Sequence, residues 1–422
     1  MPDSDIDLLL TGDELMSGDT VDSNSAMIAQ ALMLSGQKIA RKITLGDERE
    51  RLMAALKEST HRAGVLIMNG GLGPTQDDLT AELVAAAAGV PLVLHPDAEQ
   101  HVRQWCGERS IEPNDANLKQ AWLPEGAEII DNPVGSAVGF ALDIAGTLVV
   151  TTPGVPSELL AMLPTVCARV TEKLGGGELY RLRLQTFGMG ESTAQALIDN
   201  DTTPWPGDVV LGFRAGMPQL EIKLTASADT PDVQRCRQTL ERLFGDHILG
   251  ENDTTLAGAV QTVLRDQDKK LVTAESCTGG LIASMMTAEA GASSVFEAGF
   301  VTYANTIKQS VLGVSEATLE TEGAVSEAVV MQMLRGALQR SHADIGIAVS
   351  GIAGPGGGTD DKPVGTVWLA WGSADDLHTW HTVLPTDRRM FQQLVAAAGL
   401  DLVRRQLLGL PRLPHYFSRR AI

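Results

Sequence analysis

A serine in a glycine-framed turn is the sharpest chemical signal in the chain. The turn reads Ala274-Glu-Ser-Cys-Thr-Gly-Gly280 and follows a predicted strand at 270–274, and its last two residues open a predicted helix. Backbone N–H groups near Thr278 and Gly279 would surround the hydroxyl, as oxyanion stabilisation in acyl transfer requires. The turn thus predicts Ser276 as a nucleophile, although a phosphate loop or a helix cap looks the same. The substrate-binding positions predicted in this turn are Thr278, Gly279 and Gly280.

A serine hydroxyl becomes a nucleophile only beside a base. None of the four histidines after residue 255 lies in a glycine-framed turn, so a lysine is the alternative. Lys308 follows a predicted strand and can serve if desolvation lowers its pKa from the ordinary ~10.4. Tyr303, five residues earlier, would pass or orient a proton. Cys277 is a rival nucleophile, because only one of the two neighbouring side chains can face the site.

Two further features of this part of the chain suit a phosphorylated substrate. The glycine cluster Val349-Ser-Gly-Ile-Ala-Gly-Pro-Gly-Gly-Gly358 follows another predicted strand. It either wraps a substrate, with Gly351 and Gly354 in contact, or is a flexible connection. Arg388, just before the last predicted helix, offers a cation to a phosphate monoester. An isolated surface arginine is more often simply solvated.

The amino-terminal part carries a different signal, the loop Asn69-Gly-Gly-Leu-Gly-Pro-Thr-Gln-Asp-Asp-Leu-Thr80 between a predicted strand and a predicted helix. Loop N–H groups at the carboxyl end of a parallel sheet can bind phosphate oxygens. Adjacent carboxylates suggest a divalent cation such as Mg²⁺, or else the favoured charges of a helix N-terminus. Thr11-Gly-Asp-Glu14 ends another predicted strand on the same rim. The predicted nucleotide-binding positions are Gly12, Gly70, Gly71, Gly73 and Thr75, with Asp77 and Asp78 as metal ligands.

The elements that must position these residues fall into three blocks. Strands and helices alternate up to residue 174, which predicts a mostly parallel sheet with helices on both faces and a hairpin at 139–152. A small α+β unit follows, with strands of alternating polarity at 181–187 and 219–225, and a polar linker at 250–255. The last block is a second α/β sandwich, with strands at 270–274, 299–303, 345–350 and 365–371. The fold class predicted for the whole chain is α/β.

Composition excludes several classes of protein. The chain has 422 residues, 44% hydrophobic and 20% charged, as in globular proteins, so it is not disordered. A net charge of −20 and only 4% aromatic residues argue against direct nucleic-acid binding and against anionic membranes. The four cysteines form no CxxC pair and the N-terminus is acidic, so we expect a cytoplasmic protein without disulfides.

Two sets of motifs together resemble the CinA family, the competence/damage-inducible proteins. In the first half they are Gly12-Asp-Glu-Leu, Asp22-Ser-Asn-Ser, the 70–80 loop and Pro153-Gly-Val-Pro-Ser-Glu158. In the second half they are the Ser276 turn, the 303–308 segment, Gly323-Ala-Val-Ser326, Ser350-Gly-Ile-Ala-Gly354 and Lys362-Pro-Val-Gly-Thr366. The resemblance covers nearly the whole chain.

The resemblance implies three domains: a molybdopterin-binding-like domain at 1–175, a KH-like domain at 176–250 and a deamidase domain at 254–412. The last would convert nicotinamide mononucleotide to nicotinate mononucleotide and ammonia in pyridine nucleotide recycling. Its catalytic pair would be Ser276 and Lys308, with Tyr303 nearby, and it would need no cofactor. The first domain would hydrolyse ADP-ribose with a divalent metal. We also expect a homo-oligomer.

Two positions depart from the family pattern. Leu72 stands where molybdopterin-binding relatives often have threonine, which argues against molybdopterin as the ligand. Gln392 stands four residues after Arg388, where the deamidases usually have a second arginine, so one phosphate contact would be missing. The alternatives are a non-enzymatic competence or DNA-damage partner protein and a molybdenum-cofactor-binding module.

Overall fold

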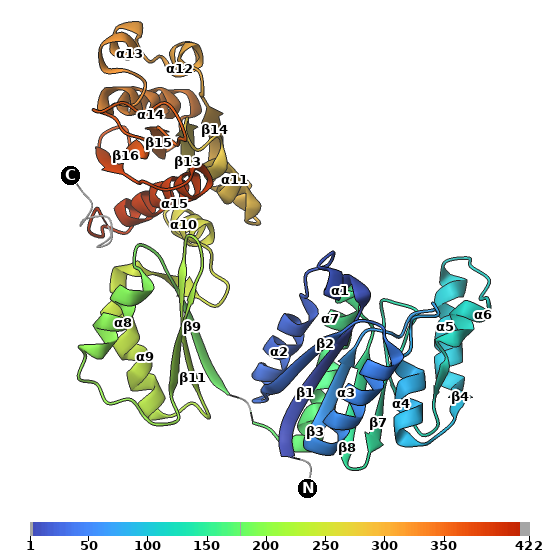
Figure 1. Ribbon diagram of the computed structural model, residues 1–422. Helices are drawn as coiled ribbons and strands as arrows, with labels where there is room; N and C mark the ends of the chain where they lie inside the picture. Colours follow the sequence, from blue (N-terminus) through green and yellow to red (C-terminus); the bar gives the residue numbers. More distant parts are fainter. Residues whose placement is uncertain (1–2, 178, 414–422) are drawn as a thin grey trace. The chain divides into compact units, whose positions relative to one another are not determined.

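Three β-sheets and a two-stranded ribbon carry the fold (Figure 1). The computed structural model describes residues 3–177 and 179–413. The chain divides into two units between Leu179 and Tyr180, and the second unit contains two of the three sheets. Within the described ranges, no helix combines the length and the apolar character that crossing a membrane requires.

The first unit is built on a six-stranded sheet. Its elements are β1 (Asp3–Thr11), α1 (Asp13–Ser17), α2 (Asn24–Leu34), β2 (Ile39–Leu45), α3 (Arg49–Arg62), β3 (Ala63–Asn69), α4 (Thr80–Ala88), β4 (Leu92–Leu94), α5 (Pro96–Glu108), α6 (Asp115–Lys119), β5 (Trp122–Pro124), β6 (Glu128–Ile130), β7 (Gly139–Ile144), β8 (Thr147–Thr152) and α7 (Pro156–Leu174). The strand order is β2-β1-β3-β8-β7-β6. The first four strands in this order are parallel, β7 is antiparallel to β8, and β6 is antiparallel to β7. The predicted hairpin is therefore confirmed as β7–β8.

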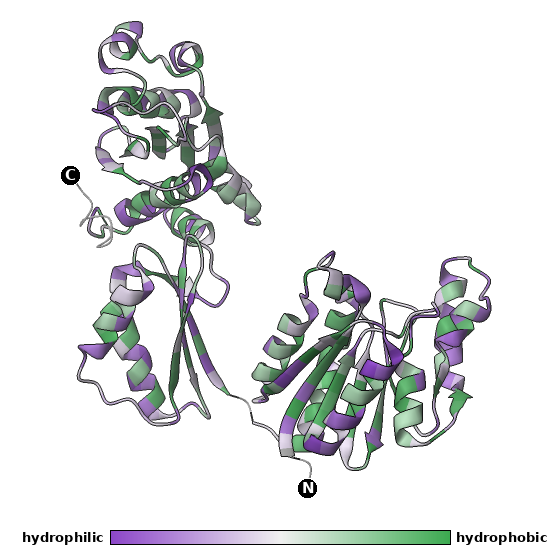
Figure 2. Ribbon diagram, viewed as in Figure 1, coloured by the Kyte–Doolittle hydropathy of each residue, from purple (hydrophilic) through white to green (hydrophobic). Residues whose placement is uncertain are grey.

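Burial explains the layers of this unit. The central strand β3 is buried along its whole length, as its apolar run Ala-Gly-Val-Leu-Ile-Met permits. Apolar residues of α3 and α4 pack on one face of the sheet, and those of α2 and α7 pack on the other. In Figure 2 the strands are largely hydrophobic, whereas the helices carry hydrophilic residues on their outer turns.

The second unit begins with a small antiparallel sheet of order β10-β11-β9-β12. Its elements are β9 (Tyr180–Thr186), α8 (Glu191–Asp199), β10 (Val210–Ala215), β11 (Leu220–Ala226), α9 (Pro231–Phe244), η1 (Gly245–His247) and β12 (Ile248–Glu251). Leu182, Leu184, Ile222, Leu240 and Phe244 belong to its own apolar core. The expected linker at 250–255 is only partly a linker, because Gly250 and Glu251 pair with β9. An edge strand is held by backbone hydrogen bonds and needs no apolar side chains, so polarity alone misidentified it.

The unit continues into a five-stranded sheet of order β14-β13-β15-β16-β17, parallel in β14, β13 and β15 and antiparallel beyond. Its elements are α10 (Leu256–Asp266), β13 (Leu271–Glu275), α11 (Leu281–Ala288), η2 (Ala292–Ser294), β14 (Phe296–Val301), α12 (Asn305–Leu312), α13 (Glu316–Glu322), α14 (Glu327–Ser341), β15 (Ile345–Gly351), β16 (Thr366–Gly372), β17 (Leu377–Val383) and α15 (Arg388–Leu407). The helix α12 was not predicted. Gly313 ends it in the left-handed conformation, at φ 69°.

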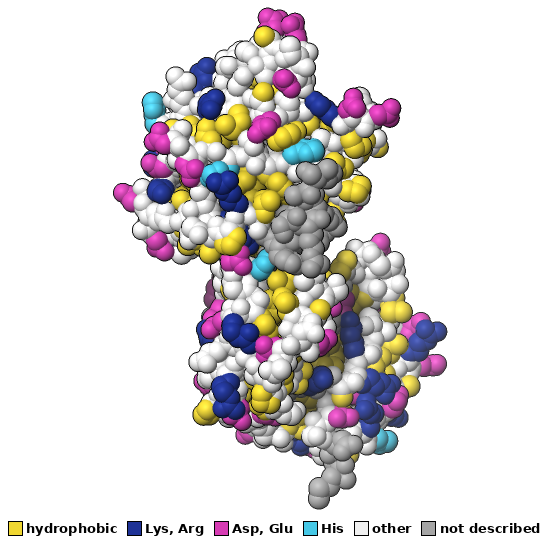
Figure 3. Space-filling view, turned by 90° about the vertical axis from the view of Figure 1, so that its left-hand side faces the viewer, with side chains coloured by type: hydrophobic (Ala, Val, Ile, Leu, Met, Phe, Trp, Pro, Cys, Tyr) yellow, Lys and Arg dark blue, Asp and Glu magenta, His cyan; other side chains and the backbone are white. Residues whose placement is uncertain are grey.

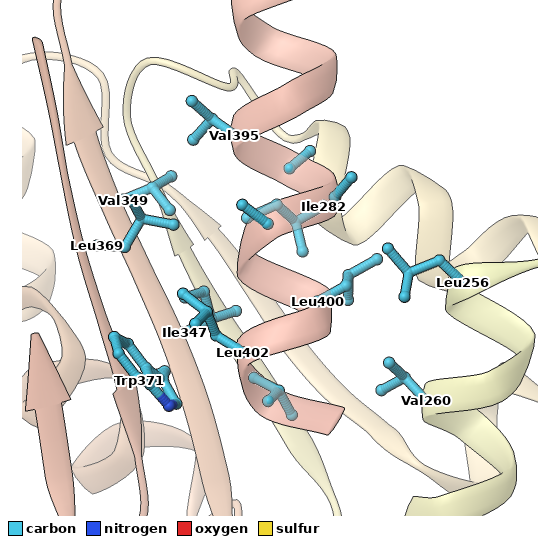
Figure 4. Packing of buried hydrophobic residues seen from close by; sticks show 14 of the residues in the cluster. Leu256, Val260, Ile282, Ile347, Val349, Leu369, Trp371, Val395, Leu400 and Leu402 are labelled. Atoms are coloured by element: carbon cyan, nitrogen blue, oxygen red, sulfur yellow. The ribbon is translucent and has the colours of Figure 1, made fainter. Parts of the chain in front are cut away.

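Among the described helices that pack on this sheet, α15 has the most buried residues. Figure 4 shows it between β15 and β16 on one side and α10 and α11 on the other, with Leu402 near Ile347 and Leu400 facing Leu256. Gly399 allows the close approach, because a Cβ there would lie 3.1 Å from Ile347 Cγ1. The position of α15, and of the side chains at its start, is therefore set by packing on both sides.

A buried ionic network fixes the far end of α15 to the small sheet. Asp401 accepts hydrogen bonds from Arg404 (2.8 Å) and Arg405 (2.7 Å), and all three side chains are buried. Arg405 also donates to the Asp246 carboxylate at 2.5 Å, and Arg404 to the Asp246 carbonyl at 2.7 Å. Buried charges are tolerated only when paired in this way. The small sheet and the five-stranded sheet are therefore joined by more than the chain connection.

Candidate active site

Ser276 and Lys308 meet at the carboxyl end of the five-stranded sheet. Ser276 directly follows β13, and its N–H donates to the Val349 carbonyl of β15 at 3.0 Å. Lys308 lies on α12, is 1% exposed, and places Nζ 3.1 Å from Ser276 Oγ. The same Nζ lies 2.8 Å from the Thr302 carbonyl oxygen and 3.0 Å from that of Tyr303. The structure thus brings together the predicted serine and lysine across 32 residues of sequence.

These three contacts decide which group donates the hydrogen bond between Ser276 and Lys308. A neutral amine has two N–H donors and one lone pair, whereas a carbonyl oxygen can only accept. The Thr302 and Tyr303 carbonyls therefore take the two N–H groups of a neutral Lys308, and its lone pair is left facing Ser276 Oγ. In that state the Ser276 hydroxyl donates to Nζ, which is the arrangement that a general base requires.

Burial favours that neutral state and disfavours the rival nucleophile. Desolvation lowers the pKa of Lys308 below its ordinary value, with the neighbouring Cys277 opposing the shift. Burial likewise raises the pKa of the Cys277 thiol to about 12. Since the thiolate is the nucleophilic form of cysteine, the geometry and the electrostatics both favour Ser276 over Cys277.

Glu275 holds the serine turn in place, a role that the sequence reading missed. Its carboxylate is fully buried and accepts four hydrogen bonds: from the Thr278 hydroxyl at 2.7 Å and from the N–H groups of Gly280, Ile282 and Ala283 at 2.9–3.0 Å. It therefore satisfies the free N–H groups at the start of α11, where the helix dipole also favours a negative charge. The only available signal was an acidic residue shortly before a predicted helix.

The predicted turn residues build the turn and do not line the cavity beside Ser276. Gly279 N–H donates to the Ser276 carbonyl at 3.1 Å, and Gly280 N–H donates to Glu275. Among the hydrogen bonds of the described residues, none is donated by the N–H groups of Cys277 and Thr278. These two N–H groups are therefore the donors of the turn that an oxyanion could recruit most readily.

A polar cavity of about 190 Å³ opens beside the pair. Gly351 and Arg388, both predicted, line it together with Tyr303, whereas Gly354 does not. Arg388 donates to the Gly354 carbonyl at 2.8 Å and to the Tyr303 hydroxyl at 3.3 Å. The Tyr303 hydroxyl thus pairs with Arg388, and it is the Tyr303 carbonyl that holds Lys308. Asn305 and Ser350 also line the cavity and were not singled out from the sequence.

Gln392, which stands where the second arginine was expected, contacts the protein backbone. Gln392 is one turn after Arg388 on α15, and its Nε2 donates to the Cys277 carbonyl at 2.9 Å. A neutral amide here supplies no charge for a phosphate. It contacts the peptide next to the nucleophile instead.

A second cavity, of about 490 Å³, lies in the first unit at the carboxyl ends of β1 and β3. Of the predicted residues, all but Thr75 line this cavity, and Thr75 donates to the Asp78 carboxylate from its backbone N–H at 2.9 Å. Gly70 and Gly71 have φ of 109° and 68°, and a Cβ at Gly70 would lie 2.5 Å from the Thr11 carbonyl oxygen. Only glycine fits this close approach.

The carboxylates of this cavity suit a hard cation only in part. Besides Asp77 and Asp78, Glu14, Asp47 and Glu158 line it, and desolvation raises the pKa of Glu158. Among the described residues, no three histidine, cysteine, aspartate or glutamate side chains form a group that could hold a metal ion. Mg²⁺ is commonly bound through one or two carboxylates plus substrate phosphates. The donor chemistry therefore fits Mg²⁺ arriving with a phosphorylated ligand, and it does not form an all-protein cage.

Together these features define a two-unit α/β protein in which a buried serine–lysine pair sits at the carboxyl end of a sheet. Comparison with known proteins agrees with this division. Residues 253–407 match the family model described as the CinA C-terminal domain, and residues 7–173 match the probable molybdopterin binding domain.

Full-length relatives settle the family. A CinA-like protein of Colwellia psychrerythraea is 46% identical over 99% of this chain and 98% of its own length. A CinA-like protein of Shewanella sediminis is 40% identical over 98% of both chains. The crystal structure of the competence/damage inducible protein CihA from Agrobacterium tumefaciens is 41% identical, covering 36% of this chain and 93% of that one, at a TM-score of 0.35. The chain belongs to the CinA family.

Glu275→Ala should destabilise the second unit markedly. The substitution leaves three backbone N–H groups and one hydroxyl without their acceptor, at a cost of roughly 2–4 kcal/mol in the free energy of unfolding. Thermal unfolding followed by circular dichroism measures this. Glu320→Ala, at an exposed position of α13, is the matched control and should stay within about 0.5 kcal/mol of the parent. Equal melting of Glu275→Ala and the parent would contradict the capping role.

Proposed function

We propose that the second unit hydrolyses the carboxamide of nicotinamide mononucleotide to give nicotinate mononucleotide and ammonia. The observation that carries the proposal is the placement of the buried Lys308 Nζ, 3.1 Å from Ser276 Oγ and within hydrogen-bonding distance of two carbonyl oxygens. The substrate class comes from the resemblance of the Ser276, 303–308 and 350–354 motifs to the nicotinamide mononucleotide deamidases.

The proposed reaction begins with acyl transfer to Ser276. Its Oγ attacks the carboxamide carbon while the proton passes to Lys308 Nζ, and a tetrahedral intermediate forms. The N–H groups of Cys277 and Thr278 are the proposed donors to the oxyanion. Lys308 then returns the proton to the leaving nitrogen, the C–N bond breaks, and ammonia departs.

Water completes the cycle by the same route. It attacks the ester of the acyl-enzyme, and its proton passes to Lys308 and then to Ser276 Oγ as the ester bond breaks. The products are nicotinate mononucleotide and the free serine. All proton transfers use one amine, and the reaction needs no metal or cofactor.

Arg388 is the proposed contact for the substrate phosphate. It lines the cavity, is exposed at the start of α15, and is already held by the Gly354 carbonyl and the Tyr303 hydroxyl. A guanidinium fixed in this way can present its remaining N–H groups to a phosphate oxygen. Tyr303 is then a positioning residue for Arg388.

For the first unit we propose binding and hydrolysis of a nucleoside diphosphate, ADP-ribose in the family resemblance, together with Mg²⁺. The supporting observation is a glycine-walled cavity with five carboxylates and no lysine or arginine among its lining residues. A pyrophosphate would be repelled there unless a cation neutralised it. Asp77 and Asp78 would hold the ion, and the ion would supply charge neutralisation.

The non-enzymatic alternative, a DNA-associated partner, finds less support. Figure 3 shows acidic and basic side chains interspersed on the face that it draws, with no continuous basic surface. The chain as a whole carries a net charge of −20, which repels a phosphate backbone. Release of ammonia from nicotinamide mononucleotide by the purified protein tests the proposal against this alternative directly.

Ser276→Ala should lower kcat/KM for ammonia release by at least about a thousand-fold, because the nucleophile is removed. Cys277→Ala should retain activity within about ten-fold, since the thiol is protonated and serves only in packing. A coupled ammonia assay on the two variants and the parent gives the comparison. Loss of activity in Cys277→Ala alone would reassign the nucleophile.

The pH dependence should report the buried amine. As pH rises towards the lowered pKa of Lys308, more enzyme carries the neutral base, so kcat/KM should rise along a single ionisation and then level off. Between this pKa and the ordinary ~10.4 of the unfolded chain, unfolded protein binds more protons. Stability should therefore fall as pH falls through that window and level off below the folded pKa.

Lys308→Arg should be inactive at every pH, because a guanidinium stays protonated. The exposed Lys270→Arg is the control for the change of side chain alone and should keep the parent profile. Melting curves establish that both variants are folded. A folded Lys308→Arg enzyme with normal kcat/KM would exclude Lys308 as the base.

Asp77→Asn should abolish Mg²⁺-dependent ADP-ribose cleavage and leave deamidation unchanged, because the two cavities lie in different units. Release of AMP, measured with and without Mg²⁺, is the readout for the first activity. Asp115→Asn, at an exposed position of α6, is the matched control. Loss of both activities in Asp77→Asn would show that the units are not independent.

A further inference from the structure

Gln392 contacts the peptide group that follows the nucleophile. Its Nε2 donates to the Cys277 carbonyl oxygen at 2.9 Å, from a partly buried position on α15. Among the hydrogen bonds of the described residues, this is the one that holds that carbonyl. The two backbone groups of Ser276 have other partners: its N–H donates to the Val349 carbonyl, and its carbonyl accepts from the Gly279 N–H.

The planarity of the peptide group extends the effect of this contact. The Cys277 carbonyl and the Thr278 N–H belong to one rigid plane and point in opposite directions. A donor that fixes the carbonyl therefore also fixes the direction of the Thr278 N–H. That N–H is one of the two groups in the turn available for an oxyanion.

The donor itself comes from a rigid support. Phe391 and Val395, on either side of Gln392, are fully or almost fully buried. Arg388 is held at the start of the helix, and Arg404 and Arg405 are held at its end. The Gln392 amide is therefore held in place and restrains the orientation of the Cys277–Thr278 peptide group.

We propose that Gln392 is a positioning residue for the serine chemistry: it aims the Thr278 N–H and restrains the backbone that carries Ser276. This inference rests on the proposed amide hydrolysis. It assigns Gln392 a role in the transition state and none in holding the substrate phosphate. Gln392 thus acts on kcat.

The test replaces the donor while keeping the length of the side chain. Gln392→Met has no donor, and kcat should fall about 10–100-fold with KM within about three-fold, because oxyanion donors are worth up to 10²–10³ in rate. Gln392→Arg keeps a donor and should recover most of the lost kcat. The pH midpoint of kcat/KM should stay at the parent value, because Lys308 is untouched. Gln393→Met, the neighbouring position, is the matched control and should behave as the parent.

A fluorophosphonate probe separates this inference from the choice of substrate. Ser276 Oγ attacks phosphorus and fluoride leaves, so the labelling rate reports the activated serine without nicotinamide mononucleotide. The expected result is slower labelling in Gln392→Met and parent-like labelling in Gln393→Met. If the parent labels at Ser276 but releases no ammonia, the proposed substrate is wrong and the labelling rates still decide the role of Gln392.

Three results would overturn the role of Gln392. They are parent-like kcat and labelling in Gln392→Met, a raised KM with unchanged kcat, and an equal loss in Gln393→Met. The second would make Gln392 a substrate-binding residue, and the third would show a general disturbance of α15.

Discussion

The second unit depends on a single constraint: an amine that is buried against two carbonyl oxygens. The Thr302 and Tyr303 carbonyls lie at the end of β14 and just before α12, and they fix Lys308 Nζ from one side. Ser276 is fixed from the other side by β13 and β15. Neither the lysine nor the serine could keep its position if the parallel strands did not end at the same edge of the sheet. The chemistry is thus a property of the sheet topology as much as of two side chains.

Burial does two things at once in this site. It lowers the pKa of Lys308, so that the amine can serve as a base. It also raises the pKa of Cys277, so that the neighbouring thiol stays protonated and is a poor nucleophile. The same desolvation would be costly for Glu275, whose carboxylate is also fully buried. That cost is offset by four hydrogen bonds at the start of α11. Burial therefore has a different consequence for each of the three groups, two of which lie in the same turn.

Much of the architecture could be predicted from the sequence, because apolar periodicity marks buried strands and helices. The strands predicted at 270–274 and 345–350 agree with β13 and β15 to within one residue, and Ser276 directly follows its strand. The site was predicted less completely. A polar helix such as α12 has little periodicity to reveal it, so Lys308 was expected beyond a strand and not on a helix. The partners of Tyr303 and Gln392 depend on tertiary contacts between distant segments, which single-sequence patterns do not encode.

The buried network at the end of α15 also sets where the chain can be divided. Asp246 precedes the polar segment at 250–255, whereas Arg404 and Arg405 follow it by about 150 residues. A cut within that segment would leave a fully buried guanidinium short of one carboxylate. A cut near Tyr180 would leave every ion pair of the network on one side. Recombination between family members should therefore be tolerated better at the first boundary than at the second, whatever their catalytic residues.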